Sequence, residues 1–309
     1  MIGKFLTYIG SVRRYSPRTC EIYKDVLEEY FAFCGNADGN PADALTYQNI
    51  RSYEVYLLDT RKENARTVNL HLSVLSSFCK FLMKEEVLQS NPVHLVTRPK
   101  QDKMLPLFYR DESMDEYFES HVGTLEYGDY EAKLRYIIVS ILANTGIRRA
   151  ELIGLDVSSV DLSRKVMRVR GKGDKMREIP LVPVICDEIS LYLQSVSSLK
   201  DASSGPDAPL LQTKKGGRLY PVLVDRAVKQ ELGEVSGITG RKSPHVLRHT
   251  LATDLLGSGA DLNSIKELLG HSSLAATQVY THNSIERLQS VYNNAHPRAK
   301  TKKDGKNGD

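Results

Sequence analysis

The sequence predicts a mainly α-helical protein with one small β-sheet, divided into a helical bundle and a larger α+β domain. Apolar residues recur at helical spacing through the first hundred residues, and one pair of β-rich segments lies within residues 166–181. A basic segment that contains proline separates the two parts. The length of 309 residues suits one large domain or two of ordinary size.

The composition is that of a folded protein that is compatible with nucleic acid. The net charge of +4 and the pI of about 8.7 make the chain mildly basic. The four cysteines lack C-x-x-C spacing, so we expect reduced thiols in a cytoplasmic protein. No apolar run approaches the roughly twenty residues of a membrane span, and the N-terminal residues lack the order of a signal peptide.

Residues 1–96 are expected to form a bundle of four or five short helices joined by short loops. Helix starts are predicted at Ser16-Pro17, at Thr46 and at Asn64 or Thr67, and Asn91-Pro92 ends the last helix. Basic side chains are scattered over these helices, a pattern that by itself favours ordinary solvated faces. Residues 97–106 contain two prolines and several basic residues, and they are expected to form an extended linker.

The second domain begins with a buried helix over residues 130–144, which Thr145-Gly146 breaks. Arg148 and Arg149 follow at the start of a short helix. Adjacent helical residues point about 100° apart, so both arginines cannot serve one phosphate. Further along, two strands flank the turn GKGDK, which carries Lys172 and Lys175 at a hairpin tip. This turn is not a phosphate-binding Walker loop, because Ser or Thr does not follow the lysine.

Residues 243–280 gather three histidines, one arginine and a terminal tyrosine on or beside predicted helices. His245 and Arg248 share a helix face, and His249 lies near it. Arginine clamps phosphate oxygens, and a nearby histidine can move a proton. Tyr280 is a weak nucleophile at its free pKa of about 10, so it needs such cationic, proton-accepting neighbours.

The same residues have alternative interpretations. The His245–His249 pair has the spacing of a zinc helix, but Val246 stands where the glutamate base would be, so we predict no metal. His249 alone fits a structural hydrogen-bonding residue better than a catalyst. Tyr280 is one of sixteen tyrosines, so only the whole constellation favours a nucleophilic role.

The spacing of these motifs resembles the tyrosine recombinases of the phage-type integrase family, most closely the Xer-type site-specific recombinases. The resemblance rests on His245-Val-Leu-Arg248-His249, then Leu269-Gly270-His271, and then Tyr280 nine residues later. Upstream, T-G-x-R followed by E-L matches the first arginine motif of the family and selects Arg148. The resemblance implies catalytic roles for Arg148, Lys172, His245, Arg248, His271 and Tyr280, with Glu151 and His249 supporting them.

The resemblance implies DNA strand breakage and rejoining through a 3′-phosphotyrosyl intermediate, with no metal, cofactor or ATP. Tyr280 would attack the phosphodiester, and Lys172 would protonate the leaving 5′ oxygen. Lys175 is the second candidate for that lysine. A type IB topoisomerase would use the same chemistry on single duplexes, and a non-catalytic DNA-binding protein is the other alternative.

The resemblance also assigns the parts of the chain. It implies a SAM-like DNA core-binding domain at 1–96, a catalytic domain at 107–295 and a basic disordered tail at 296–309. Further DNA contacts are expected from Arg18, Arg66, Arg149 and Lys175. The implied partners are double-stranded DNA with a specific core site, a homo- or hetero-tetramer on two DNA sites, and an accessory DNA translocase or DNA-bending protein.

Overall fold

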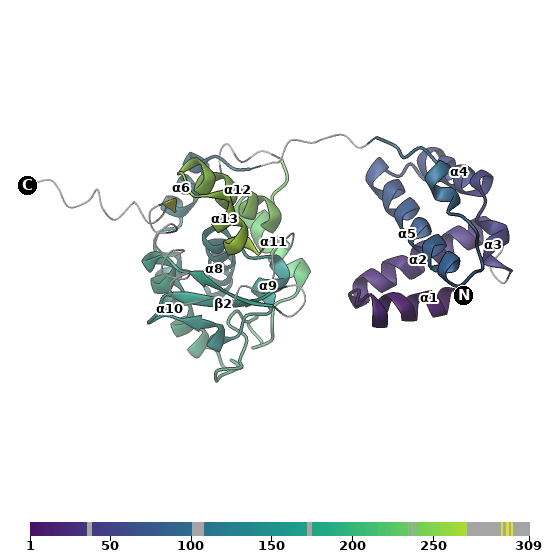
Figure 1. The fold of residues 1–309 in the computed structure, drawn as a ribbon. Coiled ribbons are helices and arrows are strands. Elements are labelled where there is room, and N and C mark those ends of the chain that lie inside the picture. The colour runs from purple at the N-terminus through teal and green to yellow at the C-terminus, as the bar shows by residue number, and fades with distance from the viewer. Residues whose placement is uncertain are drawn as a thin grey trace, which may run out of the picture. The chain divides into compact units, whose positions relative to one another are not determined.

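The computed structural model describes residues 1–35, 39–100, 108–171, 175–233, 235, 238, 240–270, 292, 295, 296 and 298. The chain divides into two compact units, Met1–Met104 and Leu105–Asp309 (Figure 1). Both units are mainly helical, and the second contains a small sheet, which confirms the predicted fold class. Within the described residues, no helix has the length and apolar character needed to span a membrane.

The first unit consists of helices only in the part that the structure describes. They are α1 (Ile2–Thr7), η1 (Tyr8–Val12), α2 (Pro17–Phe33), α3 (Pro41–Ala44), α4 (Tyr47–Val55), η2 (Tyr56–Thr60), α5 (Ala65–Lys84) and η3 (Pro92–Leu95). The core lies between α2, α4 and α5, where Tyr30, Tyr53 and Phe78 are fully buried.

Local capping explains where these helices begin. The side chains of Ser16, Thr46 and Asn64 each accept a hydrogen bond from the backbone N–H three residues later. Such a bond satisfies an N–H group that has no partner within the helix. The predicted starts of α2, α4 and α5 are therefore confirmed.

The second unit surrounds a buried central helix. Its elements are α6 (Asp111–Ser120), α7 (Thr124–Tyr127), α8 (Tyr130–Thr145), α9 (Arg149–Ile153), η4 (Val157–Ser159), β1 (Val160–Asp161), β2 (Val166–Arg170), β3 (Met176–Pro180), α10 (Pro183–Ser197), α11 (Pro221–Glu231), α12 (Pro244–Gly257) and α13 (Leu262–Leu269). Helices α10, α11 and α12 pack on α8, whose residues 136–142 are all buried (Figure 1).

The sheet has the order β1-β2-β3 and is antiparallel throughout. Met167 pairs with Ile179 and Val169 with Arg177, which confirms the predicted hairpin. Strand β1 and helices α6 and α7 were not predicted. Half of the residues of α6 are acidic, and the helix places few large apolar side chains in the core, chiefly Met114 and Tyr117.

The C-terminal residues that the structure describes pack on the second unit itself. Tyr292 and His296 both donate to the carbonyl of Asn144, the latter over 3.2 Å from Nε2. Arg298 donates to Glu188 over 2.6 Å and lies over the ring of Phe118. The sequence also predicts an amphipathic helix at 284–292, which lies outside the described residues except for Tyr292.

The expectation of a disordered tail from residue 296 onwards needs correction at its start. His296 is buried, and Arg298 is held by an ion pair with Glu188. The basic composition of this segment suggested a solvated tail, but composition cannot show that Glu188 and Asn144 lie within reach of it.

We expect the contacts of Tyr292, His296 and Arg298 to open in acid. Burial lowers the pKa of His296 to about 4, below the ordinary value of 6.5. The docked ring therefore stays neutral while an undocked ring would take up a proton as the pH falls from 6.5 towards 4. Each pH unit in that window costs docking about 1.4 kcal/mol. Amide hydrogen exchange of residues 292–298 at pH 7 and pH 5 measures this opening.

The matched variant is His296→Gln, which cannot take up the proton. The protection of these amides, relative to the intrinsic exchange rate at each pH, should change little between the two pH values. Equal protection of the wild-type segment at pH 7 and pH 5 would contradict the prediction.

Candidate active site

Arg148 stands at the junction between the central helix and α9. Helix α8 ends at Gly146, whose φ of +61° suits glycine, and a Cβ there would come within 2.6 Å of Leu269. The Arg148 guanidinium donates to Glu151 Oε1 and to the carbonyl of Gly270, each over 2.8 Å. Its backbone N–H donates to Glu151 Oε2 over 2.8 Å. Glu151 thus holds both the side chain and the backbone N–H of Arg148.

A second arginine, Arg177, holds the same glutamate. It donates from both terminal nitrogens to the two carboxylate oxygens of Glu151, over 2.8 and 2.9 Å. Burial alone would raise the pKa of Glu151, but the hydrogen bonds from Arg177 and Arg148 outweigh burial and lower it. Sequence reasoning missed Arg177. The available signal was its place on β3, where it shares the inward-facing side with Ile179.

Arg248 is buried on α12, with 6% of its surface exposed. It donates to the carbonyl of Gly146 over 2.7 Å and to that of Leu269 over 2.5 Å. Burial, followed by the charges of Arg148 and Arg177, lowers the pKa of Arg248 to about 10, so it remains a cation at neutral pH. A guanidinium has five N–H donors, so a phosphate oxygen can be added to these two contacts.

Three arginines thus converge on the last turn of α13. The carbonyls of Leu268, Leu269 and Gly270 accept from Arg177, Arg248 and Arg148, respectively. Carbonyls at a helix C-terminus lack helical partners and carry partial negative charge, so they attract cations. The residue that follows this turn in the sequence is His271.

Both histidines at the start of α12 are exposed. His245 and His249 lie one turn apart, on the side of the helix away from the buried Val246 and Leu247. Partial desolvation of its ring, with His249 and Arg248 nearby, lowers the pKa of His245. His245 is therefore neutral at neutral pH, the form that can accept a proton.

Three predicted catalytic residues, Lys172, His271 and Tyr280, lie outside the described residues. The base of the hairpin that carries Lys172 is described: the N–H of Gly171 donates to the carbonyl of Lys175 over 2.8 Å. The side chain of Lys175 is exposed.

The residues predicted to touch DNA outside the catalytic set have different surroundings. Arg149 forms an ion pair with Asp225 of α11, so α9 directs it away from Arg148, as the angle between adjacent residues requires. Arg18 is exposed and pairs with Glu21 on the same helix, over 2.6 Å. Arg66 is exposed at the start of α5.

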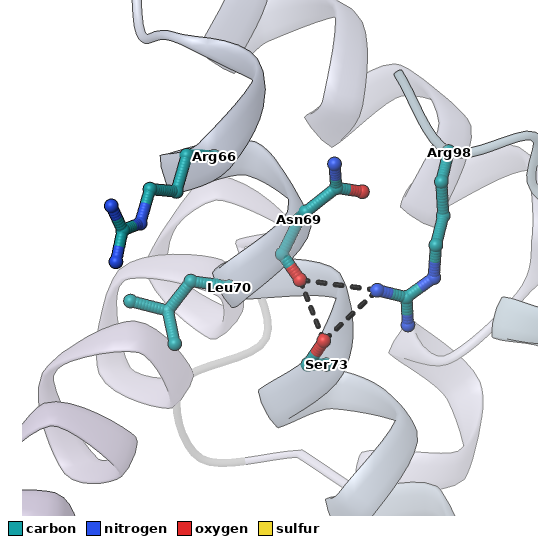
Figure 2. Close-up of a pocket in the computed structure, with 5 residues that line it drawn as sticks. All are labelled: Arg66, Asn69, Leu70, Ser73 and Arg98. Atoms are coloured by element: carbon teal, nitrogen blue, oxygen red, sulfur yellow. Dashed lines mark hydrogen bonds between the residues drawn. The ribbon is translucent and has the colours of Figure 1, made fainter. Parts of the chain in front are cut away.

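Arg66 lines an open depression on α5 together with Asn69, Leu70 and Ser73 from the same helix and Arg98 from the beginning of the predicted linker (Figure 2). Arg98 donates to Ser73 Oγ over 2.9 Å, and Asn69 donates to the carbonyl of Pro99 over 2.9 Å. Residues 98–99 are therefore strapped along α5 in the first unit. This depression adds two arginines to one face of the helix.

Chemically, the cluster in the second unit brings together guanidinium groups, which can bind an anion. Arg148 and Arg248 come from different helices and meet at the end of α13, while His245 offers a proton acceptor on the same helix as Arg248. The described residues contain no group of three or more His, Cys, Asp or Glu side chains placed to hold a metal ion.

The sequence matches the model of the phage integrase family over residues 119–287. It also matches the phage integrase N-terminal SAM-like domain over residues 2–86. The chain therefore belongs to the phage integrase family. It is a tyrosine site-specific recombinase, an enzyme that breaks and rejoins DNA strands. The predicted family, fold and enzyme class are confirmed.

Among curated relatives, tyrosine recombinase XerC of Bacillus pumilus is 36% identical over 304 residues, which cover 97% of each chain. Tyrosine recombinase XerC of Alcanivorax borkumensis is also 36% identical, covering 98% of this chain and 95% of its own. The fold is similar to that of XerH site-specific recombinase bound to a palindromic difH substrate (TM-score 0.70, 20% identity, 94% and 83% of the two chains covered). The Tn1549 transposon integrase in complex with circular intermediate DNA has a TM-score of 0.68 at 17% identity, with 93% and 98% covered.

Proposed function

We propose that this recombinase exchanges DNA strands at a specific core site, with Tyr280 as the nucleophile and Arg148 and Arg248 as the clamp on the scissile phosphate. The observation that carries the proposal is the convergence of both guanidinium groups on the carbonyl end of α13. Attack on a phosphodiester builds negative charge on its non-bridging oxygens. Preorganised donors aimed at such charge each lower the barrier by roughly 3 kcal/mol or more.

The remaining roles follow from protonation. His245 accepts the proton of Tyr280 and returns it in the reverse step, a role supported by its lowered pKa. His271 donates a hydrogen bond to the phosphate, and Lys172 protonates the leaving 5′ oxygen, because an alkoxide is a poor leaving group. The phosphotyrosyl ester keeps the energy of the broken bond, so a 5′ hydroxyl of another strand reseals it.

The two parts of the chain divide the work. Residues 1–96 form the DNA core-binding domain, residues 97–106 the linker and residues 107–295 the catalytic domain. Arg66 and Arg98 in the depression on α5, together with Arg18 and Lys175, contact the phosphate backbone. Arg149 is engaged by Asp225 and contributes less.

Four copies act on two DNA sites, as a homo- or hetero-tetramer, because reciprocal exchange joins strands of two duplexes. The protein works in the cytoplasm, and an accessory DNA translocase or DNA-bending protein sets the direction of the reaction. Three biological roles use this chemistry: resolution of chromosome dimers, integration and excision of an element, and inversion of a segment.

Covalent trapping tests the proposal. The protein is mixed with sheared genomic DNA of its source in EDTA and denatured, and the ends of the protein-linked DNA are sequenced. We expect adducts at one site or a few related sites, with protein on the 3′ end. Adducts scattered over many sequences would contradict site-specific recombination and indicate general DNA relaxation instead. Absence of any adduct would refute autonomous cleavage.

A further inference from the structure

We propose that Arg177 is a positioning residue of the phosphate site: it holds Glu151 behind Arg148 and fixes the end of α13 from which His271 follows. This inference deepens the proposed function and rests on it. Arg177 is assigned no contact with the substrate, because all three nitrogens of its guanidinium donate to protein acceptors.

The buried guanidinium of Arg177 has a hydrogen-bond acceptor for each of its nitrogens. Arg177 is 6% exposed, and a buried cation is costly unless it is paired and hydrogen-bonded. Two of its nitrogens bind the two oxygens of Glu151, which is the bidentate geometry that arginine and carboxylate favour. Its Nε donates to the carbonyl of Leu268 over 3.0 Å. A lysine has one nitrogen and cannot make this set of contacts.

Arg177 also sets the net charge around Arg148. Glu151 sits between Arg148 and Arg177, so the three groups together carry one net positive charge. Without Arg177, Glu151 would neutralise Arg148 alone and keep it from a phosphate. With Arg177 present, the carboxylate orients Arg148 while the cluster keeps a positive charge for the anion. Arg248 adds a second such charge beside it.

Arg177 also packs against both the β2–β3 hairpin and the residue that follows α13. Gly270 has a φ of +68°, and a Cβ on it would come within 3.1 Å of the Arg177 guanidinium. A Cβ on Gly171 would lie 3.4 Å from the same group. Arg177 therefore packs between the base of the turn that carries Lys172 and the glycine that precedes His271. One side chain sets the separation of two segments that supply catalytic groups.

The variants that test this are Arg177→Met and Arg177→Lys. Arg135→Met is the control, because Arg135 also pairs with a buried glutamate, Glu231, over 2.9 Å, on the α8–α11 side of the same unit. The substrate is a duplex with the site recovered by trapping, nicked beside the cleavage position so that the adduct accumulates. Duplex binding and single-turnover cleavage are measured for each variant from pH 5.5 to pH 9.

We expect Arg177→Met to bind the duplex within about threefold of wild type and to cleave it about 10- to 100-fold more slowly, the effect seen when a group that orients a metal ligand is lost. Removing Arg177 raises the pKa of Glu151. The defect should therefore be larger at acid pH and shrink as the pH rises. The cleavage rate of Arg177→Lys should fall between those of wild type and Arg177→Met, and Arg135→Met should cleave at the wild-type rate.

Two results would overturn the proposal: unchanged cleavage by Arg177→Met, or an equal, pH-independent loss in Arg177→Met and Arg135→Met. Amide hydrogen exchange at residues 265–270 provides a readout that needs no activity. It should rise in Arg177→Met and stay unchanged in Arg135→Met, and unchanged exchange in both would refute the anchoring. If the wild type forms no adduct, the proposed function fails while this exchange still decides the role of Arg177.

Discussion

Replacing Tyr280 by phenylalanine is expected to abolish the covalent protein–DNA adduct while leaving DNA binding within about twofold of wild type. The substitution removes only the hydroxyl that attacks the phosphate and keeps the ring. Loss of a nucleophile costs catalysis far more than loss of a supporting group, and a fall of at least about 10⁴-fold in the cleavage rate is expected. Denaturing electrophoresis of protein with labelled site DNA measures the adduct.

The control is Tyr292→Phe, the nearest tyrosine along the chain that the structure describes. Tyr292 is buried and donates to the carbonyl of Asn144, and burial raises its pKa, so it is a poor candidate for the nucleophile. Tyr292→Phe should still form the adduct. An adduct that persists in Tyr280→Phe and disappears in another tyrosine variant would move the nucleophile elsewhere.

Replacing Arg248 by methionine is expected to slow cleavage by about 10²- to 10³-fold, the effect of removing one preorganised donor from a developing oxyanion. The same change leaves the carbonyls of Gly146 and Leu269 without their arginine donor. Hydrogen bonds that involve a charged group are worth about 1.5–3 kcal/mol each, so the free energy of unfolding should also fall. Single-turnover cleavage and denaturant unfolding measure the two effects separately.

Thr253→Ala on the same helix is the control for Arg248→Met. Thr253 is exposed and bonds only to the backbone of its own helix in the contacts described, at His249. It should change neither cleavage nor unfolding by more than a small amount. If Arg248→Met cleaves at the wild-type rate at a temperature where the variant is folded, Arg248 does not belong to the phosphate clamp.

The fold was largely predictable because its local signals are strong. The starts of α2, α4 and α5 and the stop of α8 at Gly146 depend on residues within one turn of each other, and the strands of the β2–β3 hairpin are joined by one short turn. Helix α6 escaped prediction because it is short, half of its residues are acidic, and it has few large apolar residues. The packing of His296 and Arg298 escaped because their partners lie more than a hundred residues away.

The site was predictable in part for the same reason. Glu151 lies three residues from Arg148, so the sequence alone indicated that pair. Arg149 is adjacent to Arg148, and its separate direction also followed from helix geometry. That Arg149 would meet Asp225 was not predictable, because the partner comes from α11, which only packing brings close.

By itself, the sequence determined the class of enzyme and the local structure around Arg148 and Arg248. The tertiary structure alone decided that Arg177, 26 residues from Glu151, completes its ion pair, and that Arg248 reaches Gly146 across 102 residues. A cap or a turn is set by neighbours along the chain. A buried cation is set by the partners that surround it after folding, because burial is tolerable only where those partners meet.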